Sequence, residues 1–379
     1  MKKVVTLFWL VCFLMASSVS AAIAPVPAPP ALAANSYILM DFNSGRILAS
    51  KDVDKKIEPA SITKIMTAYV VYKEIEAGRL SMQSQVTVSK KAWQMGGSKM
   101  FIEVGKQVSV DDLLKGLVIQ SGNDAAIALA EHIGGSEDVF ASLMNQYAAK
   151  LGMNNTYFVN STGWPDSRHL TTARDIATLA RATIAEFPDH YRLYAEHEFT
   201  WNNITQPNRN LLLYRDNTVD GIKTGHTDSA GYCLVSSAVR DNMRLISVVT
   251  GTKSDAARAD ISQALLGYGY RFYESDQMYV AGEGLNKTRV WKGREENLSI
   301  GLEDDLHITV PRGQYKKLNT VMEVAPDIEA PVQKGQQLGM VRVMLDGEEI
   351  LSRPLVALQT VAEGSLWQRA RDNIIRFFQ

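Results

Sequence analysis

A chain of 379 residues is long enough for two domains or one large one, and its 46% hydrophobic and 21% charged residues are ordinary for a globular protein. Its formal net charge of −1 at pH 7 excludes nucleic-acid binding through overall basicity, and we expect no nucleic-acid partner. An anionic ligand would have to be held by a local site.

The N-terminus has the pattern of a secretory signal. Lys2 and Lys3 precede an apolar run over 4–15, and small residues follow over 16–22. We therefore expect residues 1–21 to be a signal peptide that is removed, so that the mature protein works outside the cytoplasm. A transmembrane anchor is the alternative, but the apolar run is short for a span of about 20 residues.

Residues 22–34, AIAPVPAPPALAA, contain four prolines and no charge, which predicts a stiff, extended leader without a core of its own.

The region 35–276 mixes helices with antiparallel hairpins and is expected to form one domain. SYILMDF, NSG and RILAS read as strand, turn and strand. A helix should run from Ser61 to about Glu76. Further helices are predicted over 110–132 with a break at QSGND, over 138–151, after His169 with a threonine N-cap, and over SDAARADISQALLGYGY, closed by glycine. GYCLVSSAV, RDN and RLISVVTG predict a second hairpin.

From about Gln277 the pattern changes to short alternating apolar runs broken by proline, glycine and the hairpin pair Asp346-Gly347. Residues 277–360 are therefore expected to form a separate, sandwich-like all-β domain.

The tail 361–379 is expected to hold an amphipathic helix. Helical spacing places the apolar residues Leu366, Trp367, Ala370, Ile374, Phe377 and Phe378 on one face and polar residues opposite. Such a helix can lie in a bilayer interface, so we predict a membrane surface as a partner. A helix docked on its own domain is the alternative.

Ser61 and Lys64 stand one helical turn apart in EPASITKIMTAYVV, residues 58–71. Residues i and i+3 share a helix face, so the Lys64 amine can reach the Ser61 hydroxyl. A serine becomes a good nucleophile when a base takes its proton, and a lysine is such a base when burial or nearby positive charge keeps its amine neutral. An N-cap serine followed by a lysine that extends to water is the alternative.

Two further motifs favour catalysis. Ser121-Gly-Asn123 breaks a helical region, and Lys223-Thr-Gly225 opens a strand about a hundred residues later. The motifs S-x-x-K, S-x-N and K-T-G each occur once, in the order found in penicillin-binding proteins and class A β-lactamases.

Each residue of these motifs can have a chemical role. Ser121 can relay a proton between Lys64 and a leaving nitrogen, and Asn123 can hold both a substrate amide and the Lys64 amine. Lys223 adds a positive charge that helps to keep Lys64 neutral.

The strand motif can bind substrate. Thr224 can bond a carboxylate, and Gly225 lets a peptide lie along the strand as an added edge. We expect the backbone N–H groups of Ser61 and His226 to form the oxyanion hole.

On these residues the chain resembles the serine-type D-alanyl-D-alanine carboxypeptidases, the low-molecular-mass penicillin-binding proteins of the membrane-bound two-domain type. The resemblance runs from about Ser36 to the C-terminus and includes GLVIQSGNDAAIALAEHI, VDGIKTGHT, ITVPRG and RPLVAL. It implies an α+β fold: a β-lactamase/transpeptidase-like domain with helices on both sides of an antiparallel sheet, a small all-β domain and a terminal amphipathic helix.

The resemblance also implies a function. Ser61 would attack the bond between two D-alanines of a peptidoglycan stem pentapeptide, and β-lactam antibiotics would acylate the same serine. Arg258 would bind the substrate's terminal carboxylate, and 92–101 would flank the active site. The enzyme would take part in cell-wall remodelling at the periplasmic face of the inner membrane. His169 would be structural.

Three other functions stay open. A β-lactamase would share the motifs, but Glu198, the first residue of an E-x-x-x-N match, lies in a strand-like pattern. A penicillin- or wall-sensing module would be acylated without turnover, and an endopeptidase would cut cross-links. We expect no metal, because no H-E-x-x-H occurs, and no cofactor, because no phosphate loop occurs.

Overall fold

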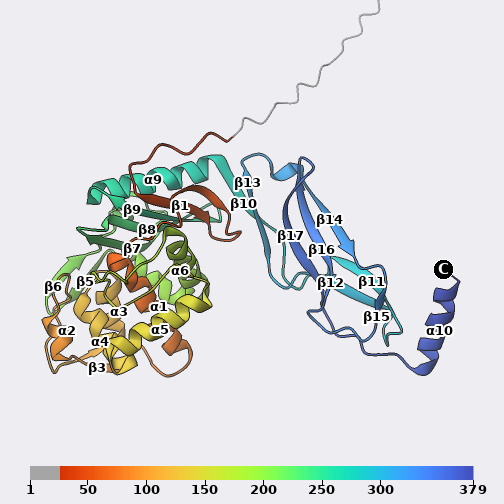
Figure 1. Ribbon diagram of the computed structural model, residues 1–379, viewed down its shortest axis with the longest axis horizontal. Helices are drawn as coiled ribbons and strands as arrows, with labels where there is room; N and C mark the ends of the chain where they lie inside the picture. The colour runs from red at the N-terminus through yellow and green to blue at the C-terminus, as the bar shows by residue number, and fades with distance from the viewer. Residues whose placement is uncertain (1–25, 379) are drawn as a thin grey trace, which may run out of the picture.

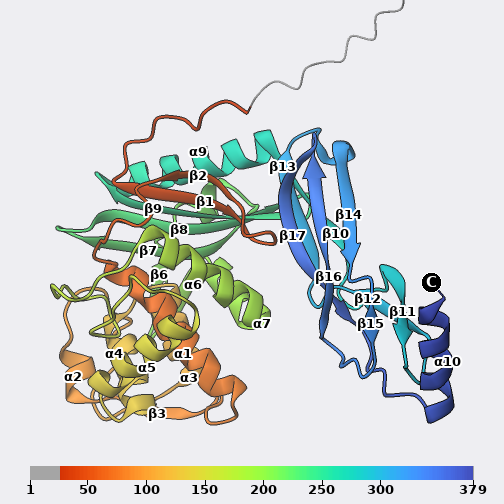
Figure 2. The same cartoon turned by 45° about the vertical axis from the view of Figure 1, so that its right-hand side comes forward.

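The computed structural model describes residues 26–378, so the predicted signal peptide 1–21 lies outside the described residues. Figures 1 and 2 show two bodies: a larger one that holds the helices, and an elongated all-β one that carries the C-terminal helix at its far end.

The larger body is built on a five-stranded antiparallel sheet in the order β2-β1-β9-β8-β7. Helix α9 lies on one face together with the short helical segment 212–215, and the main helical layer lies on the other (Figure 1). The strands are β1 (Ser36–Asp41), β2 (Ile47–Lys51), β7 (Val219–Thr227), β8 (Gly231–Arg240) and β9 (Met243–Thr252). Both faces are covered, which explains why β9 is apolar and buried over most of its length.

The helical layer packs around α1, whose first nine residues are buried. It comprises η1 (Ala60–Thr63), α1 (Lys64–Glu76), α3 (Val110–Val118), α4 (Asn123–Gly134), α5 (Glu137–Lys150) and α6 (Ala173–Glu186). The predicted break at QSGND is confirmed, since α3 ends before Ser121 and α4 begins at Asn123. Thr172 caps α6 as predicted, accepting from the N–H of Asp175.

Short elements complete this body. They are α2 (Lys90–Gln94), α7 (Pro188–Tyr191), η2 (Arg192–Ala195), α8 (Leu212–Arg215), the pair β3 (Gln85–Thr87) and β4 (Gln107–Ser109), and the pair β5 (Glu198–Trp201) and β6 (Ile204–Pro207).

The predicted end of α9 is wrong. The helix spans Asp255–Phe272 and continues through its glycines instead of closing at them. A Cβ on Gly269 would lie 2.5 Å from Leu245 Cδ1, so this glycine lets the helix pack closely on the sheet. Strand β10 begins at Tyr273, directly after α9, rather than near Gln277.

The second body is all β, as predicted. Its six-stranded sheet has the order β14-β16-β17-β12-β11-β15, antiparallel except for β11 and β15, and β10 pairs with β13. The elements are β10 (Tyr273–Tyr279), β11 (Asn286–Trp291), β12 (Asn297–Gly301), β13 (Leu306–Pro311), η3 (Tyr315–Lys317), β14 (Leu318–Val324), β15 (Ile328–Glu329), β16 (Gln337–Leu345) and β17 (Glu348–Ala357). They enclose an apolar core of their own.

The described part of the leader, from residue 26, packs on an apolar cluster formed by other segments of the chain. Val26 and Leu32 are half-buried against an apolar cluster beneath α9, and Tyr268 Oη donates to Pro27 O at 3.0 Å. The contact is made by apolar residues of the leader, among and after its prolines.

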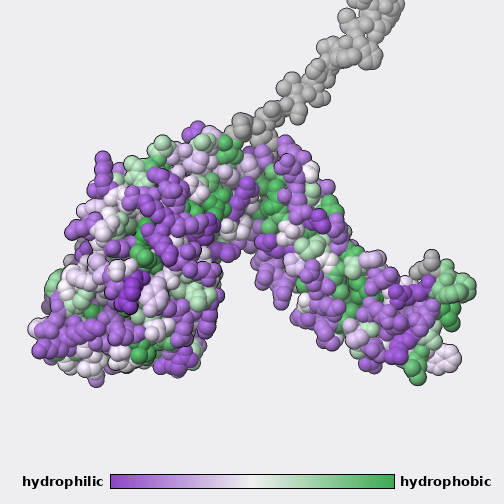
Figure 3. Space-filling model, viewed as in Figure 1, coloured by the Kyte–Doolittle hydropathy of each residue, from purple (hydrophilic) through white to green (hydrophobic). Residues whose placement is uncertain are grey.

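The chain ends in helix α10 (Leu366–Phe377), capped by Ser365. Its outer side is apolar, as the space-filling view in Figure 3 shows. Among the helices of the described residues, none combines the length and apolar character needed to cross a bilayer.

Candidate active site

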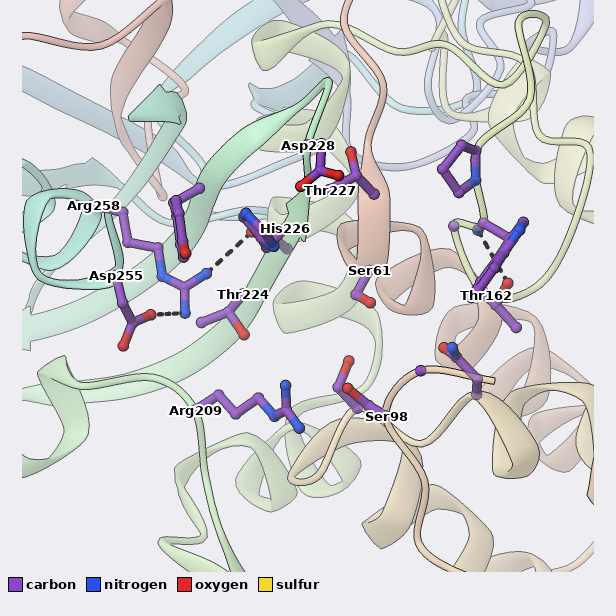
Figure 4. A pocket seen from close by; sticks show the side chains of 18 of the residues that line it. Ser61, Ser98, Thr162, Arg209, Thr224, His226, Thr227, Asp228, Asp255 and Arg258 are labelled. Carbon is purple, nitrogen blue, oxygen red and sulfur yellow. Dashed lines mark hydrogen bonds and ion pairs between the residues drawn. The ribbon is translucent and has the colours of Figure 1, made fainter. Parts of the chain in front are cut away.

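A cavity of about 910 Å³ opens in the first body between β7 and the helical layer (Figure 4). The predicted residues Ser61, Ser121, Asn123, Thr224, Gly225, His226 and Arg258 all line it. Lys64 and Lys223 are buried at 1% and 3% exposure. Lys64 reaches the cavity residues Ser61 and Asn123 through its amine, whereas Lys223 lies on β7 beside Thr224.

Ser61 and Lys64 meet at the junction of η1 and α1. Lys64 Nζ lies 3.0 Å from Ser61 Oγ, one turn along the chain, as the spacing predicts. The alternative of a lysine extending to water is wrong, because the amine is buried.

Two acceptors fix the Lys64 amine. Nζ donates to Asn123 Oδ1 at 2.7 Å and to the backbone oxygen of Thr162 at 2.7 Å. The amide of Asn123 is oriented in turn, because its Nδ2 donates to Gly96 O at 2.8 Å. A neutral amine has two N–H donors, which these acceptors use, and its lone pair is then left for the hydroxyl proton of Ser61.

Burial, followed by the positive charge of Arg209, lowers the pKa of Lys64 to about 7, although the carboxylate of Asp124 acts in the opposite direction. Lys223 was expected to supply that charge. Burial lowers the pKa of Lys223 itself well below its usual value, with the charges of Lys64, Arg209 and Arg258 contributing, and Arg209 adds a positive charge near Lys64 that the motifs did not indicate.

Ser121 is held with its hydroxyl free. It has a left-handed backbone, φ 66°, at the turn between α3 and α4. Its Oγ is buried and forms no hydrogen bond with any residue in the described range. Since buried hydroxyls are nearly always bonded, this one is available for a group that enters the cavity.

Strand β7 forms one wall, with Thr224 and His226 lining the cavity. Gly225, which also lines the cavity, has a structural role besides the one expected. A Cβ there would lie 3.0 Å from Ile62 Cγ1 and 3.1 Å from Pro59 O, so the missing side chain lets β7 pack against the turn that carries Ser61.

Two arginines lie on one side of Ser61, with Thr162 on the other (Figure 4). Arg258, on α9, is already engaged: it donates to Gly225 O at 3.1 Å and Cys233 O at 3.3 Å and pairs with Asp255. Arg209 forms neither an ion pair nor a hydrogen bond with other side chains or backbone of residues 26–378. The sequence motifs did not reveal Arg209, because it stands in a loop outside them.

A second missed feature is the loop that supplies Thr162 O. Gly163, with φ 83°, lies so close to the Ser61 turn that a Cβ would be 1.7 Å from Ala60 O. Glu137 holds the loop by accepting from Ser161 N at 3.0 Å and Ser161 Oγ at 2.7 Å. The sequence did not reveal Thr162 as a partner of Lys64, because it contributes its backbone oxygen and not its side chain.

The loop within 92–101 does flank the cavity, through Gly97 and Ser98. Asp124, buried at the start of α4, fixes it by accepting from the N–H groups of Met100 at 3.0 Å and Phe101 at 2.9 Å.

Two other residues lie apart from this chemistry. His169 is buried, accepts from Val159 N at 3.2 Å and contacts Thr63 Oγ1 at 2.9 Å, and burial lowers its pKa to about 4. Glu198 is exposed on β5 and does not line the cavity.

The arrangement suits acyl transfer. It holds a hydroxyl beside a buried amine of lowered pKa, a free second hydroxyl, and a cationic end for an anionic group.

Comparisons with known proteins agree with an acyl-transfer site. Residues 23–254 match the family described as D-alanyl-D-alanine carboxypeptidase, and residues 273–363 match the penicillin-binding protein 5 C-terminal domain. The chain is 44% identical to D-alanyl-D-alanine carboxypeptidase DacC of Escherichia coli, over 97% of this chain and 93% of the relative. It is 41% identical to DacA of the same organism, over 93% and 90%.

A solved structure gives the same result. Penicillin binding protein 5 from Haemophilus influenzae superposes with a TM-score of 0.86 at 40% identity, covering 89% of this chain and 100% of that one. With the motif residues gathered around one cavity and both domains matched, the chain belongs to the family of D-alanyl-D-alanine carboxypeptidases, which are serine hydrolases.

Proposed function

We propose that this chain is a carboxypeptidase that removes the terminal D-alanine from peptidoglycan stem pentapeptides through an acyl-enzyme on Ser61. The observation that carries the proposal is the buried Lys64 amine, 3.0 Å from Ser61 Oγ, with both of its N–H donors engaged by Asn123 and Thr162.

Acylation uses these groups in order. Lys64 takes the Ser61 proton as Oγ attacks the carbonyl carbon between the two D-alanines. The backbone N–H groups of Ser61 and His226 stabilise the negative oxygen of the tetrahedral intermediate. Ser121 then passes the proton from Lys64 to the leaving nitrogen, the carbon–nitrogen bond breaks, and D-alanine departs. Water, activated by Lys64, hydrolyses the remaining ester.

The carboxylate of the leaving D-alanine is bound at the cationic end of the cavity. Arg209 is exposed and has no partner among the described residues, and Thr224 lines the same region. Arg258, to which the sequence assigned this role, lines the same cavity and is fixed there by contacts with the β7 and β8 backbone and with Asp255. It adds positive charge at this end of the cavity and stays a predicted carboxylate ligand beside Arg209.

β-Lactams imitate the scissile bond and acylate Ser61. The match of the second domain to that of a penicillin-binding protein supports this.

The protein is exported and works at the periplasmic face of the inner membrane, held there by α10. Support comes from the signal pattern of 1–21 and from the exposed apolar side of α10. For the apolar side of α10 the membrane is preferred over the β domain as partner, because Trp367 and Phe377 face away from that domain, at 87% and 85% exposure.

The test measures D-alanine released from a pentapeptide, together with the intact mass after benzylpenicillin treatment. We expect release and a covalent adduct with the wild type, neither with Ser61→Ala, and both with Ser142→Ala, an exposed serine on α5. An adduct without D-alanine release would favour a sensing module. Rapid loss of the adduct with turnover of nitrocefin would favour a β-lactamase. Cleavage of cross-linked peptide dimers, without release of D-alanine from the pentapeptide, would favour an endopeptidase.

A further inference from the structure

Helix α10 places its polar side, not its apolar side, against the β domain. Asp372 in its middle is 2% exposed, whereas Leu366, Trp367, Phe377 and Phe378 are between 78% and 87% exposed. An amphipathic helix that packs on its own domain ordinarily buries its apolar stripe, so this orientation is the reverse of the usual one.

Asp372 makes the central contact. Its Oδ2 accepts from the backbone N–H of Lys292 at 2.6 Å, and its Oδ1 accepts from Arg371 at 3.2 Å and lies 3.7 Å from Arg289. A buried carboxylate is tolerated only with such partners, so the helix cannot leave the domain without losing the Lys292 N–H and the charge of Arg289.

The three arginines of α10 are each paired as well. Arg369 binds Glu363 at 2.6 Å, Arg371 binds Glu296 at 2.5 Å, and Arg376 binds Glu329 at 2.9 Å and Asp327 at 3.3 Å. Two guanidinium groups lie over the Trp291 ring, that of Arg289 at 3.8 Å from its centroid and that of Arg376 at 5.5 Å.

The cluster that holds α10 is electrically balanced. Five cationic side chains meet five carboxylates: Arg289, Lys292, Arg369, Arg371 and Arg376 against Glu296, Asp327, Glu329, Glu363 and Asp372. The arginines, which would attract anionic headgroups on a free helix, are neutralised by the domain's own acids.

We propose that α10 is folded and fixed on the β domain before it meets a bilayer, with Asp372 as the positioning residue. Its membrane partner is then the apolar boundary of the bilayer, whatever the headgroup charge. This proposal rests on the membrane association proposed above. What α10 recognises is the acyl-chain region of the bilayer, through five apolar side chains that already face outward: Leu366, Trp367, Ile374, Phe377 and Phe378.

The first measurement is flotation of the mature chain, beginning at residue 22, with vesicles of pure phosphatidylcholine or of phosphatidylcholine with phosphatidylglycerol. We expect binding to the two to agree within about threefold, and to survive a rise from low to high salt, since screening weakens only charge attraction. Binding that needs the anionic lipid and is lost in salt would overturn the inference while leaving membrane association intact. Binding to neither vesicle would overturn the association itself.

The second measurement is hydrogen exchange of α10 without vesicles. We expect protected amides in the wild type, exchange faster by about tenfold or more in Asp372→Ala, and no change in Asp327→Asn, which alters an exposed partner of Arg376. In Asp372→Ala the released arginines should make vesicle binding depend on anionic lipid. Unprotected α10 amides in the wild type, or an unchanged lipid preference in Asp372→Ala, would contradict the proposal that Asp372 fixes α10 on the β domain.

Discussion

Single backbone positions decide whether the Ser61–Lys64 pair works. Lys64 is held by a carbonyl oxygen, that of Thr162, and the loop carrying it approaches the Ser61 turn because residue 163 has no side chain. Ala60, next to the nucleophile, is itself in the left-handed region at φ 49°, which costs a non-glycine residue about 1 kcal/mol or more. The reacting atoms are therefore positioned by packing of main chain on main chain.

Gly163→Ala should lower the rate of Ser61 acylation by benzylpenicillin roughly a hundredfold, because the loop must move and take Thr162 O away from Lys64. Gly152→Ala is the matched control, since Gly152 has φ 75° but nothing within 4 Å of its would-be Cβ. Equal rates in the two variants would show that the close approach at residue 163 is unimportant.

The acylation rate should rise with pH and reach half its maximum near the Lys64 pKa of about 7, since the amine must be neutral to accept a proton. Arg209→Ala removes a positive charge that lowers this pKa, so the midpoint should move to higher pH. Stopped-flow acylation measured across the pH range checks both. Arg192→Ala, which alters an exposed surface arginine, should keep the wild-type midpoint.

At the scale of elements, the cavity lies where loops are fixed to helices by buried carboxylates. Asp124 at the start of α4 and Glu137 at the start of α5 each accept from backbone N–H groups of a separate loop. These loops in turn carry Gly96 O, which orients Asn123, and Thr162 O, which holds Lys64. Helices α4 and α5 thereby position the backbone oxygens of Gly96 and Thr162, which belong to neighbouring loops.

Asp124→Ala should lower the free energy of unfolding by about 3 kcal/mol, because the N–H groups of Met100 and Ala125, which are buried, and of Phe101, which is part-buried, lose their acceptor. Thermal melting measures this. Asp138→Ala, at an exposed acidic position in the first turn of α5, should change stability little. A similar loss in both variants would mean that the first-turn charge matters and the loop contacts do not.

The sequence was most informative where function depends on side chains at fixed spacing. The i, i+3 relation of Ser61 and Lys64 predicted their contact, and the break after α3 was visible in QSGND. Arg209 and Thr162 were missed because one lies in a loop with no motif and the other contributes only its backbone oxygen. The face that α10 turns outward depends on acids in distant strands, which periodicity alone does not reveal.

At the scale of the whole molecule, the two bodies are joined through more than the chain. Arg46 Nη1, after the β1 turn, donates to Thr309 O on β13 at 2.5 Å, and Ser44 Oγ lies 2.6 Å from Thr309 Oγ1. Arg312 donates to Tyr270 O at 2.7 Å, at the end of α9. These contacts hold β13 against both the sheet and the long helix.

Replacing Arg46 with alanine and Thr309 with valine together should broaden the distribution of distances between spin labels placed on α5 and β16. Release of D-alanine from a soluble pentapeptide should stay within about twofold of the wild-type rate, because the cavity lies wholly in the first body. An unchanged distance distribution would mean that the junction of α9 and β10, with the contacts of Arg312 and Ser275, fixes the domains without the Arg46 and Ser44 contacts.

The absence of a spacer between α9 and β10 has a consequence for reach. The first turn of α9 carries Arg258 at the catalytic cavity, and the residue after its last turn begins the β domain, whose opposite end bears α10 (Figure 2). If α10 rests on a bilayer, as proposed, the β domain acts as a spacer of fixed length that holds the active-site cavity at one distance from the membrane. Only stem peptides of the cell wall at that distance from the membrane would then be cleaved. A longer or shorter β domain would change the distance at which cleavage occurs.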